Sequence, residues 1–404
     1  MARPRHIVAI DLGTTKVLAA AASCSSALPT LVAHGGAPCA AMRRGVVVDL
    51  EAAAAAIGQA VAPVLQALRG HPGGVWVGVT GAHLECCNLQ GSCAVASPEV
   101  GVTRAEVDAA LQAAGATLAL PSDREVVHAI PRSFAIDGQA GVTNPVGMSA
   151  RALEVSTHVV TGTTTLLDNL EKAVLRAGLA VEELVFEPIA AAHAVLTPAD
   201  RDLGTLLVDV GGGTTDFALF VDGGVCHSGS VPLAGAQVTR DLAMALGLEL
   251  AEAERIKLAA GHCLYQEIGE EEEVPARSLQ GGEQRISRRY LAGLIAARME
   301  EIFRLLAAEV AKSQFTARLT RGMVLTGGSA QLPGIGELAR TVTGWPVRLG
   351  RAQGVVADPA LSADPAWATA LGLLLYASAQ QSEAAWPERR SPWHWLLRFL
   401  HLAP

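Results

Sequence analysis

Two segments about 200 residues apart share one layout, and this repetition constrains the fold more than any other feature of the chain. Each has an apolar run, an aspartate, a turn rich in glycine and threonine, and a second apolar run. They are HIVAIDLGTTKVLAAAA, starting at His6, and TLLVDVGGGTTDFALFV, starting at Thr205. Apolar runs around such a turn predict a β-hairpin. The repetition therefore predicts two related α/β halves, with a ligand held between them.

Both turns carry residue types that suit phosphate binding. In the first turn the backbone N–H groups can point at an anion, and the residues are Gly13, Thr14, Thr15 and Lys16. In the second turn three glycines let a ligand approach the backbone, and the residues are Gly211, Gly212, Gly213, Thr214, Thr215 and Asp216. Asp11 and Asp209 would face one another across a cleft and hold Mg²⁺ through its water shell. The alternative is two unrelated, solvated hairpins.

A third glycine-rich element follows in RGMVLTGGSAQLPGIGELA. We expect a strand over residues 323–325, then small residues, then a helix beginning near Gly334. The small residues are Gly327, Gly328 and Ser329, and they would let a flat ring approach the backbone.

The order and spacing of IDLGTTK, VDVGGGTTD and LTGGSAQLPG resemble the first phosphate, second phosphate and adenosine motifs of the actin-like ATPase superfamily. The resemblance implies an α/β fold with two lobes, actin-like and related to ribonuclease H, that binds ATP and Mg²⁺. FEPIAAAHAVL resembles the connecting motif, which implies that Glu187 orients a catalytic water, with Asp11 and Asp209 near the metal. AEAERIK resembles the stretch that borders the adenosine, through Glu254 and Lys257. By spacing alone, this last pair is an ordinary helical i,i+3 pair.

Residues 81–158 change character, with short strand-like pieces around one helix, and predict a small α+β insert. Thr103 and Glu106 form a capping-box pattern that marks the start of that helix. The pieces VTGAHLECCNLQG and DREVVHAIPRSFAIDG are similar to the subdomain of the FtsA family that replaces the one found in actin. Similarity to FtsA covers nearly all of residues 6–380. His83, His128 and His158 lie in the insert, and we expect them to be hydrogen-bonded structural residues and not metal ligands.

The tail WHWLLRFLHL predicts an amphipathic helix. A broad apolar arc and one basic residue suit a membrane interface, and the residues are Trp393, Trp395, Leu396, Leu397, Arg398, Phe399 and Leu400. The alternative is a terminal helix docked on the protein's own core. FtsA tails tend to be richer in lysine, which reduces the expected electrostatic share of membrane binding.

The expected domains follow from these motifs. Residues 1–80 and 159–203 form the first lobe, and residues 81–158 form the insert. The second lobe comprises residues 204–235 and 321–379, with a helical lid at 236–320. A linker at 380–390 and the amphipathic helix at 391–404 complete the chain.

Composition excludes several classes of function. The formal net charge is −8 and no basic block exceeds a pair, which argues against nucleic-acid binding. Seven cysteines without a CxxC pair argue against a disulfide framework and a zinc site. The N-terminal residues lack the pattern of a signal peptide, so we expect a cytosolic protein. No uninterrupted apolar run is long enough to span a membrane, so membrane contact should be peripheral.

The resemblance to FtsA implies a weak, Mg²⁺-dependent ATPase that polymerises on the cytoplasmic face of the bacterial inner membrane at the division site. Its expected partners are the C-terminal tail of FtsZ, bound at the lid, further copies of itself, and later division proteins. Two alternatives remain at this stage. One is a metabolic kinase of the same superfamily, which needs an acceptor pocket. The other is a pilus-assembly adaptor with a similar fold and insert.

Overall fold

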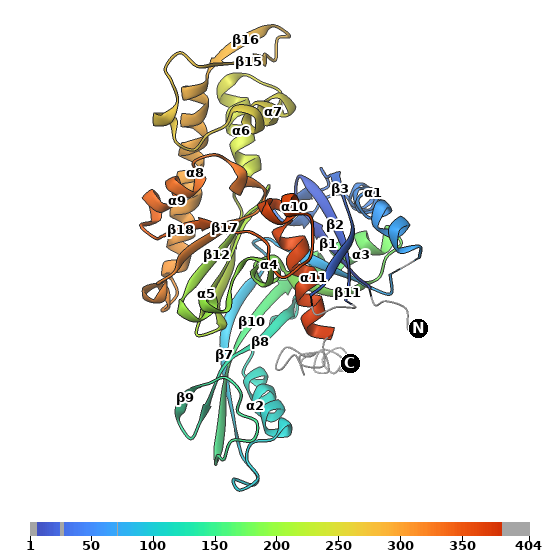
Figure 1. Cartoon of the computed structure of the whole chain (residues 1–404), viewed down its shortest axis with the longest axis vertical. Helices are drawn as coiled ribbons and strands as arrows, with labels where there is room; N and C mark the ends of the chain where they lie inside the picture. The colour runs from blue at the N-terminus through green and yellow to red at the C-terminus, as the bar shows by residue number, and fades with distance from the viewer. Residues whose placement is uncertain (1–5, 25–27, 71, 382–404) are drawn as a thin grey trace.

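The computed structural model describes residues 6–24, 28–70 and 72–381, and shows two lobes side by side with one extension above and one below (Figure 1). The first lobe contains a five-stranded sheet in the order β11-β6-β1-β2-β3. Its strands are β1 (His6–Leu12), β2 (Lys16–Ser23), β3 (Thr30–Pro38), β6 (Val75–Val79) and β11 (Val181–Phe186). The first three strands pair antiparallel, whereas β6 and β11 run parallel to β1.

The second lobe repeats this topology strand for strand. Its sheet order is β14-β13-β12-β17-β18, again with three antiparallel strands followed by two parallel ones. The strands are β12 (Thr205–Val210), β13 (Thr215–Val221), β14 (Gly224–Val231), β17 (Gly322–Thr326) and β18 (Val347–Leu349). Even the register repeats, because Asp11 lies opposite Leu18 and Asp209 lies opposite Asp216. The predicted two-lobed actin-like architecture is confirmed.

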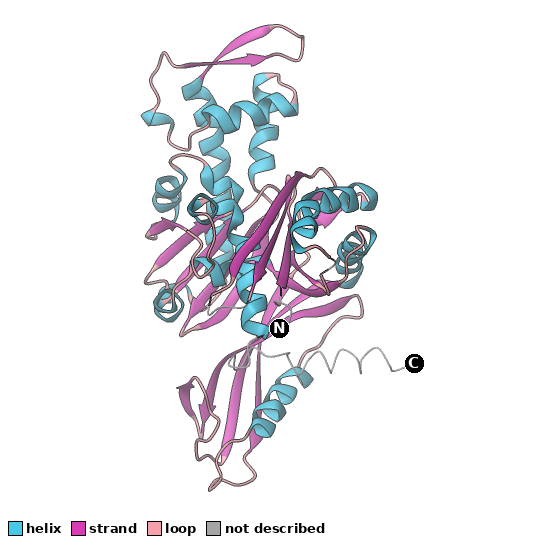
Figure 2. Ribbon diagram, turned by 45° about the vertical axis from the view of Figure 1, so that its right-hand side comes forward, coloured by secondary structure: helices cyan, strands magenta, loops and turns pink. Residues whose placement is uncertain are grey.

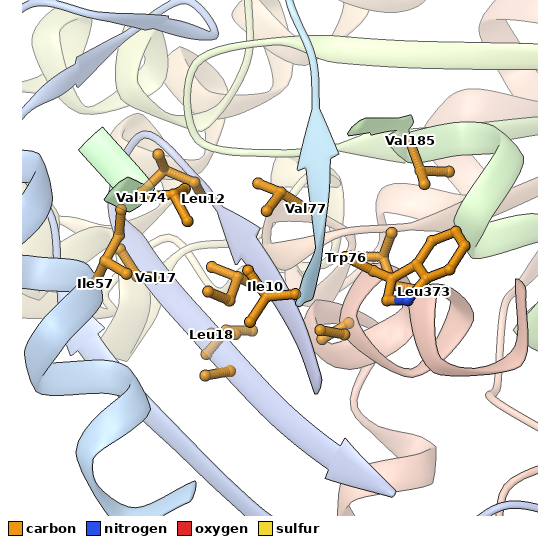
Figure 3. Close-up of a cluster of buried hydrophobic side chains, with 14 of the residues drawn as sticks. Ile10, Leu12, Val17, Leu18, Ile57, Trp76, Val77, Val174, Val185 and Leu373 are labelled. Atoms are coloured by element: carbon orange, nitrogen blue, oxygen red, sulfur yellow. The ribbon is translucent and has the colours of Figure 1, made fainter. Parts of the chain in front are cut away.

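Helices α1 (Leu50–Leu68) and α3 (Thr164–Arg176) cover the first sheet. Aliphatic side chains from the strands and from α1 meet in the core, including Ile10, Leu18 and Ile57 (Figure 3). By length and apolar composition α1 could cross a membrane. However, its inner face packs closely on β3, where a Cβ on Gly35 would lie 2.2 Å from the carbonyl oxygen of Ala60. This contact is typical of a core helix in a soluble domain.

Two helices lie where the lobes meet. They are α4 (Glu187–Val195) and α11 (Ala368–Gln381), with the short α5 (Pro198–Leu203) and α10 (Pro359–Ala363) nearby in sequence. Their backbones touch, because a Cβ on Gly372 would lie 2.2 Å from the carbonyl oxygen of Ala190. This close crossing needs the small residues that the sequence places there, and it brings the start of α4 to the junction of the lobes.

The insert is a separate α+β unit at the lower end of the molecule (Figure 1). Its sheet has the order β7-β10-β8-β9 and its own apolar core. The elements are β7 (Glu85–Ala94), α2 (Arg104–Ala116), β8 (Arg124–Ile136), β9 (Gln139–Val142) and β10 (Ala152–Thr163). The predicted helix starts as expected, since the carboxylate of Glu106 accepts a hydrogen bond from the backbone N–H of Thr103 at 2.9 Å.

Although the insert leaves the first lobe, its sheet docks on β14 of the second lobe. The side chain of His158 bonds Ser228 through Nε2 and Asn88 through Nδ1, both at 2.9 Å. Asn88 also donates to the carbonyl oxygen of Cys226 at 2.8 Å. His128 accepts a bond from the backbone N–H of Phe186 at 2.9 Å. The prediction of hydrogen-bonded histidines is confirmed for His128 and His158. It is wrong for His83, whose two ring nitrogens are buried without a hydrogen-bond partner in the structure. The insert is bonded to both lobes.

The lid rises from the second lobe at the opposite end (Figure 2). It consists of α6 (Gly235–Leu246), α7 (Leu250–Ala260), β15 (Glu273–Arg277), β16 (Glu283–Ser287) and α8 (Arg288–Ala311). The helices were expected but the hairpin β15–β16 was not. Four consecutive glutamates, residues 270–273, lead into this hairpin. Two of them pair with the start of α8, Glu272 with Arg288 at 2.6 Å and Glu270 with Arg289 at 2.7 Å.

The remaining elements are short. The hairpin β4 (Met42–Arg43) and β5 (Val46–Val47) precedes α1, and α9 (Ile335–Thr343) follows the third glycine-rich element with its N-cap at Gly334, as predicted. Because α11 runs to Gln381, the first two residues of the predicted linker are helical. The predicted membrane-binding residues 393–400 lie outside the described residues.

Candidate functional site

The two glycine and threonine turns have the same internal geometry. In each, the N–H of the first glycine donates to the carbonyl oxygen three residues later, from Gly13 to Lys16 and from Gly211 to Thr214, both at 3.0 Å. This bond closes the turn and leaves the intervening N–H groups outside the strand ladder. They are therefore free for the anion binding that the sequence predicts, which stays a prediction.

The two turns pack directly on each other in this structure. A Cβ on Gly213 would lie 2.2 Å from Oγ1 of Thr14, and a Cβ on Gly212 would lie 2.8 Å from Cγ2 of Thr15. Only glycine allows this approach. A phosphate chain between the turns therefore requires the lobes to move apart at this point.

Four carboxylates gather beside the turns. Asp11 and Asp209 are the next-to-last residues of β1 and β12, and Asp216 is the second residue of β13. Glu187 begins α4 and lies against Gly78 of β6. Burial raises the pKa of Asp11 to about 6, although the nearby Lys16 opposes it. Burial and then the charge of Asp11 raise the pKa of Asp209 to about 7. Burial and the other three carboxylates raise the pKa of Glu187 well above its usual value.

Hydroxyl groups hold two of these carboxylates in place. Thr369 of α11 donates to Asp209 at 2.8 Å, and Thr80, after β6, donates to Asp216. Thr80 also lies 2.9 Å from the hydroxyl oxygen of Thr214. The bonds of Thr80 join the two lobes, whereas the bond of Thr369 joins α11 to β12. Neither threonine was predicted, because each comes from an element remote in sequence from the turn that it supports.

The carboxylates fit a cation that is held through water. Oε1 of Glu187 and Oδ1 of Asp216 are buried with no hydrogen-bond partner in the structure, which is costly unless a donor or cation comes to them. Among the described residues no group of three acidic, histidine or cysteine side chains could ligate a metal directly. The Mg²⁺ site at Asp11 and Asp209 stays a prediction, and an ion there would keep several of its waters.

The third glycine-rich element lies against the second turn. Gly327 has φ +89°, and a Cβ there would lie 2.2 Å from Oδ1 of Asp209, so only glycine fits. The hydroxyl of Ser329 donates to the carbonyl oxygen of Gly211 at 2.7 Å. Gly328 faces the first lobe, because a Cβ there would lie 3.9 Å from Nζ of Lys16.

Lys257 and Glu254 of α7 form an ion pair at 2.6 Å next to the same element. Lys257 is buried and also donates to Thr239 at 2.9 Å and to the carbonyl oxygen of Gly235 at 3.2 Å. A Cβ on Gly235 would lie 2.4 Å from Oγ of Ser329. The pair is therefore more than a surface i,i+3 contact. It joins the lid to the wall of the cleft, where the resemblance places the adenosine.

The family comparison decides between the interpretations that share this fold. Residues 206–372 match the model of the cell division protein FtsA, and residues 81–161 match the SHS2 domain inserted in FtsA. The chain is 36% identical over 381 residues to the cell division protein FtsA of Pseudomonas aeruginosa, covering 94% of this chain and 91% of the relative. It is 35% identical over 390 residues to FtsA of Neisseria meningitidis serogroup B, covering 95% and 93%. The chain belongs to the FtsA family.

Solved structures agree on the fold of this FtsA-family protein. The PilM-PilN type IV pilus biogenesis complex matches with a TM-score of 0.65 and 17% identity, over 91% of this chain and 97% of that one. MreB5 of Spiroplasma citri bound to ADP matches with a TM-score of 0.55 and 15% identity, over 92% and 96%. These likenesses show the actin-like fold alone. The identity to FtsA proteins therefore favours a cell division protein over the pilus adaptor and the metabolic kinase.

Proposed function

We propose that this protein binds ATP with Mg²⁺ in the cleft and polymerises on the cytoplasmic face of the inner membrane, where it anchors the FtsZ ring and recruits later division proteins. The observation that carries the nucleotide part is the convergence of the two turns, the third glycine-rich element and four buried carboxylates at one junction. Family membership supports the division-site role. The solved MreB5 structure holds ADP, which is consistent with a nucleotide in this fold.

In the proposed site the two turns hold the phosphates through backbone N–H groups, and Lys16 contributes a positive charge. Asp11 and Asp209 would hold Mg²⁺ through water, and the metal would offset the phosphate charge. Glu187 would orient the attacking water, because its carboxylate is buried beside Asp11 and Asp209 and has a free acceptor oxygen. Gly327, Gly328, Ser329, Glu254 and Lys257 would border the nucleoside. Phosphoryl transfer requires a protein to position the phosphate, the metal and the water more than to form covalent intermediates. The site would therefore support weak ATPase activity.

The lid supports the proposed FtsZ contact. Several large apolar side chains are exposed there, including Met244, Leu250, Leu258 and Tyr290. Exposed apolar side chains that lie together on helices can dock a peptide. We therefore assign the FtsZ C-terminal tail to residues 236–320, as the resemblance implies.

Fluorescence anisotropy with a labelled tail peptide tests this assignment. Leu258→Glu should weaken binding of the peptide. Leu175→Glu, at an exposed site in the first lobe, should not weaken it.

The membrane part rests on the apolar arc of residues 393–400. Burying four large apolar side chains there contributes several kcal/mol before ordering costs, at roughly 1.5 to 3 kcal/mol each. One tail binds marginally, and a polymer that carries many tails binds much more tightly. Membrane binding should depend only weakly on the salt concentration, because few basic residues flank the arc.

Co-sedimentation with anionic lipid vesicles, with and without Mg²⁺-ATP, tests the proposal. Wild-type protein should pellet with vesicles, and more so with nucleotide. Leu397→Glu should remain in the supernatant while it binds ATP normally, and Leu175→Glu should behave as wild type. If Leu397→Glu protein still pellets, or loses its fold, the tail is a docked structural helix and the tether is wrong.

A further inference from the structure

The side chain of Thr80 bonds the first lobe to the second lobe beside the phosphate turns. Thr80 is the residue after β6, and its hydroxyl donates to Oδ2 of Asp216 on β13. Because the only proton of this hydroxyl goes to the carboxylate, the 2.9 Å contact with the hydroxyl of Thr214 is a bond that Thr214 donates. One buried hydroxyl group therefore makes two bonds to the opposite lobe.

The backbone of Thr80 is held in the first lobe from two sides. The preceding residue, Val79, pairs with Phe186 in the five-stranded sheet. On the other side lies Gly45, in the turn between β4 and β5, where a Cβ would be 2.5 Å from the carbonyl oxygen of Thr80. Gly45 also has φ +79°, a conformation that favours glycine. Thr80 therefore cannot follow the second lobe when the lobes part, and both of its bonds must break.

These bonds act directly beside the contact that closes the cleft. A Cβ on Gly213 would lie 2.2 Å from Oγ1 of Thr14, so the closed turns leave no room for a phosphate group at this point. Thr214, which donates to Thr80, is the next residue after Gly213. Entry of a phosphate chain requires the turns to separate, and separation requires the bonds of Thr80 to break.

Loss of the Thr80 hydroxyl should favour the open arrangement of the lobes. In the closed protein Oδ2 of Asp216 would lose the donor from Thr80, and Oδ1 of the same carboxylate already has no partner. A buried carboxylate without donors is costly, whereas water can bond it once the cleft opens. Removing the hydroxyl therefore raises the free energy of the closed state more than that of the open state.

We propose that the bonds of Thr80 to Thr214 and Asp216 form a latch that keeps the unliganded cleft closed and limits the entry of nucleotide. A ligand that binds only the open molecules has an apparent affinity that is reduced by the fraction of molecules in the open state. The identity of the ligand, a nucleoside triphosphate with Mg²⁺, rests on the proposed function. Closure by the latch is a property of the nucleotide-free protein and can be measured without a ligand.

Hydrogen exchange of the nucleotide-free, full-length protein, followed by mass spectrometry, tests closure. Thr80→Val keeps the shape of the side chain and removes the hydroxyl. Peptides that contain the two turns, residues 12–16 and 211–215, should exchange roughly tenfold faster in this variant, as expected for the loss of a hydrogen bond to a charged group. Thr80→Ser keeps the hydroxyl and should exchange like wild type. Thr80→Ala serves as the second variant if Thr80→Val does not fold.

The matched control is Thr157→Val in the insert. The hydroxyl of Thr157 is also buried, but it has no hydrogen-bond partner in the structure, so its removal should leave exchange of the turns unchanged. Equal exchange of the turns in wild type and Thr80→Val, or equal acceleration in Thr157→Val, would overturn the latch.

Stopped-flow mixing with Mg²⁺ and a fluorescent ATP analogue tests the control of entry. Thr80→Val should bind the analogue roughly tenfold more tightly than wild type, with faster association, because more molecules are open. Thr80→Ser should restore the wild-type values. Slower or weaker binding by Thr80→Val would show that Thr80 supports the bound state instead, and the latch would be wrong. If wild-type protein binds no analogue, the proposed function fails, and the exchange measurement alone decides whether Thr80 closes the cleft.

Discussion

Replacing Asp209 by asparagine should stabilise the nucleotide-free protein at alkaline pH and abolish its response to Mg²⁺-ATP. The carboxylate is 7% exposed and lies among Asp11, Asp216 and Glu187, with one fixed donor, Thr369. Its pKa of about 7 in the folded protein compares with an ordinary value of 3.8. At 1.36 kcal/mol per pKa unit, keeping the group ionised costs roughly 4 kcal/mol of stability above pH 7. Because the buried asparagine has its own desolvation cost, we expect a gain of about 2 kcal/mol.

The sign of the pH dependence follows from the raised pKa. Folding raises the pKa of Asp209, so protonation of this group favours the folded state. The folded protein is therefore most stable relative to the unfolded chain below pH 3.8, and this stability is lost as the pH rises through about 7. The advantage of Asp209→Asn over wild type should therefore be largest at pH 8 and small near pH 5. The amide oxygen can still accept the bond from Thr369, so the fold should be unchanged.

Thermal unfolding by circular dichroism at pH 5 and pH 8, with and without Mg²⁺-ATP, measures both effects. Wild-type protein should gain stability from Mg²⁺-ATP at pH 8, and the variant should not. Asp168→Asn, at an exposed aspartate on α3, is the matched control and should change neither curve. Equal melting temperatures of wild type and Asp209→Asn at pH 8, or a difference that does not shrink toward pH 5, would refute the picture of a strained carboxylate cluster.

Three further predictions concern other contacts. Gly213→Ala places a Cβ 2.2 Å from Oγ1 of Thr14, so it should force the turns apart and lower the thermal stability of the nucleotide-free protein by about 1–3 kcal/mol in a denaturation assay. His158→Leu leaves the hydroxyl of Ser228 without its partner and should increase hydrogen exchange of the insert strands, at a cost of about 1–3 kcal/mol. Glu187→Gln should retain ATP binding and reduce phosphate release in a colorimetric assay. Unchanged release would assign the water-orienting role to another residue.

The architecture was predictable because its signals are local. Aspartate at the end of an apolar run followed by glycines specifies a hairpin, and the second copy specifies a second lobe. The glycines of the third element were likewise recognisable, and the structure explains Gly327 by its positive φ and its contact with Asp209. These positions tolerate only one residue type, so they carry their geometry in the sequence.

The supporting shell was not predictable, because its partners are distant in sequence. Thr80 and Asp216 are 136 residues apart, and Thr369 and Asp209 are 160 residues apart. Nothing in the sequence around either threonine distinguishes Thr80 from an ordinary loop residue or Thr369 from an ordinary helix residue. The hairpin β15–β16 was missed for another reason. Each strand has only five residues, and Pro275 lies within the first of them, which weakens the strand signal.

The docking of the insert on β14 makes it a lever. Hydrogen bonds from β7 and β10 attach the upper end of the insert to the second lobe, and the chain connects the insert to the first lobe. Relative rotation of the lobes must therefore break those bonds or swing the insert as one body. Its longest strand, β8, has 13 residues and therefore measures roughly 40 Å at about 3.3 Å per residue. A turn of roughly 5° at the joint then carries the far tip, near β9, through about 3 to 4 Å. Opening a cleft by a small angle thus becomes a displacement that another protein touching that tip can sense.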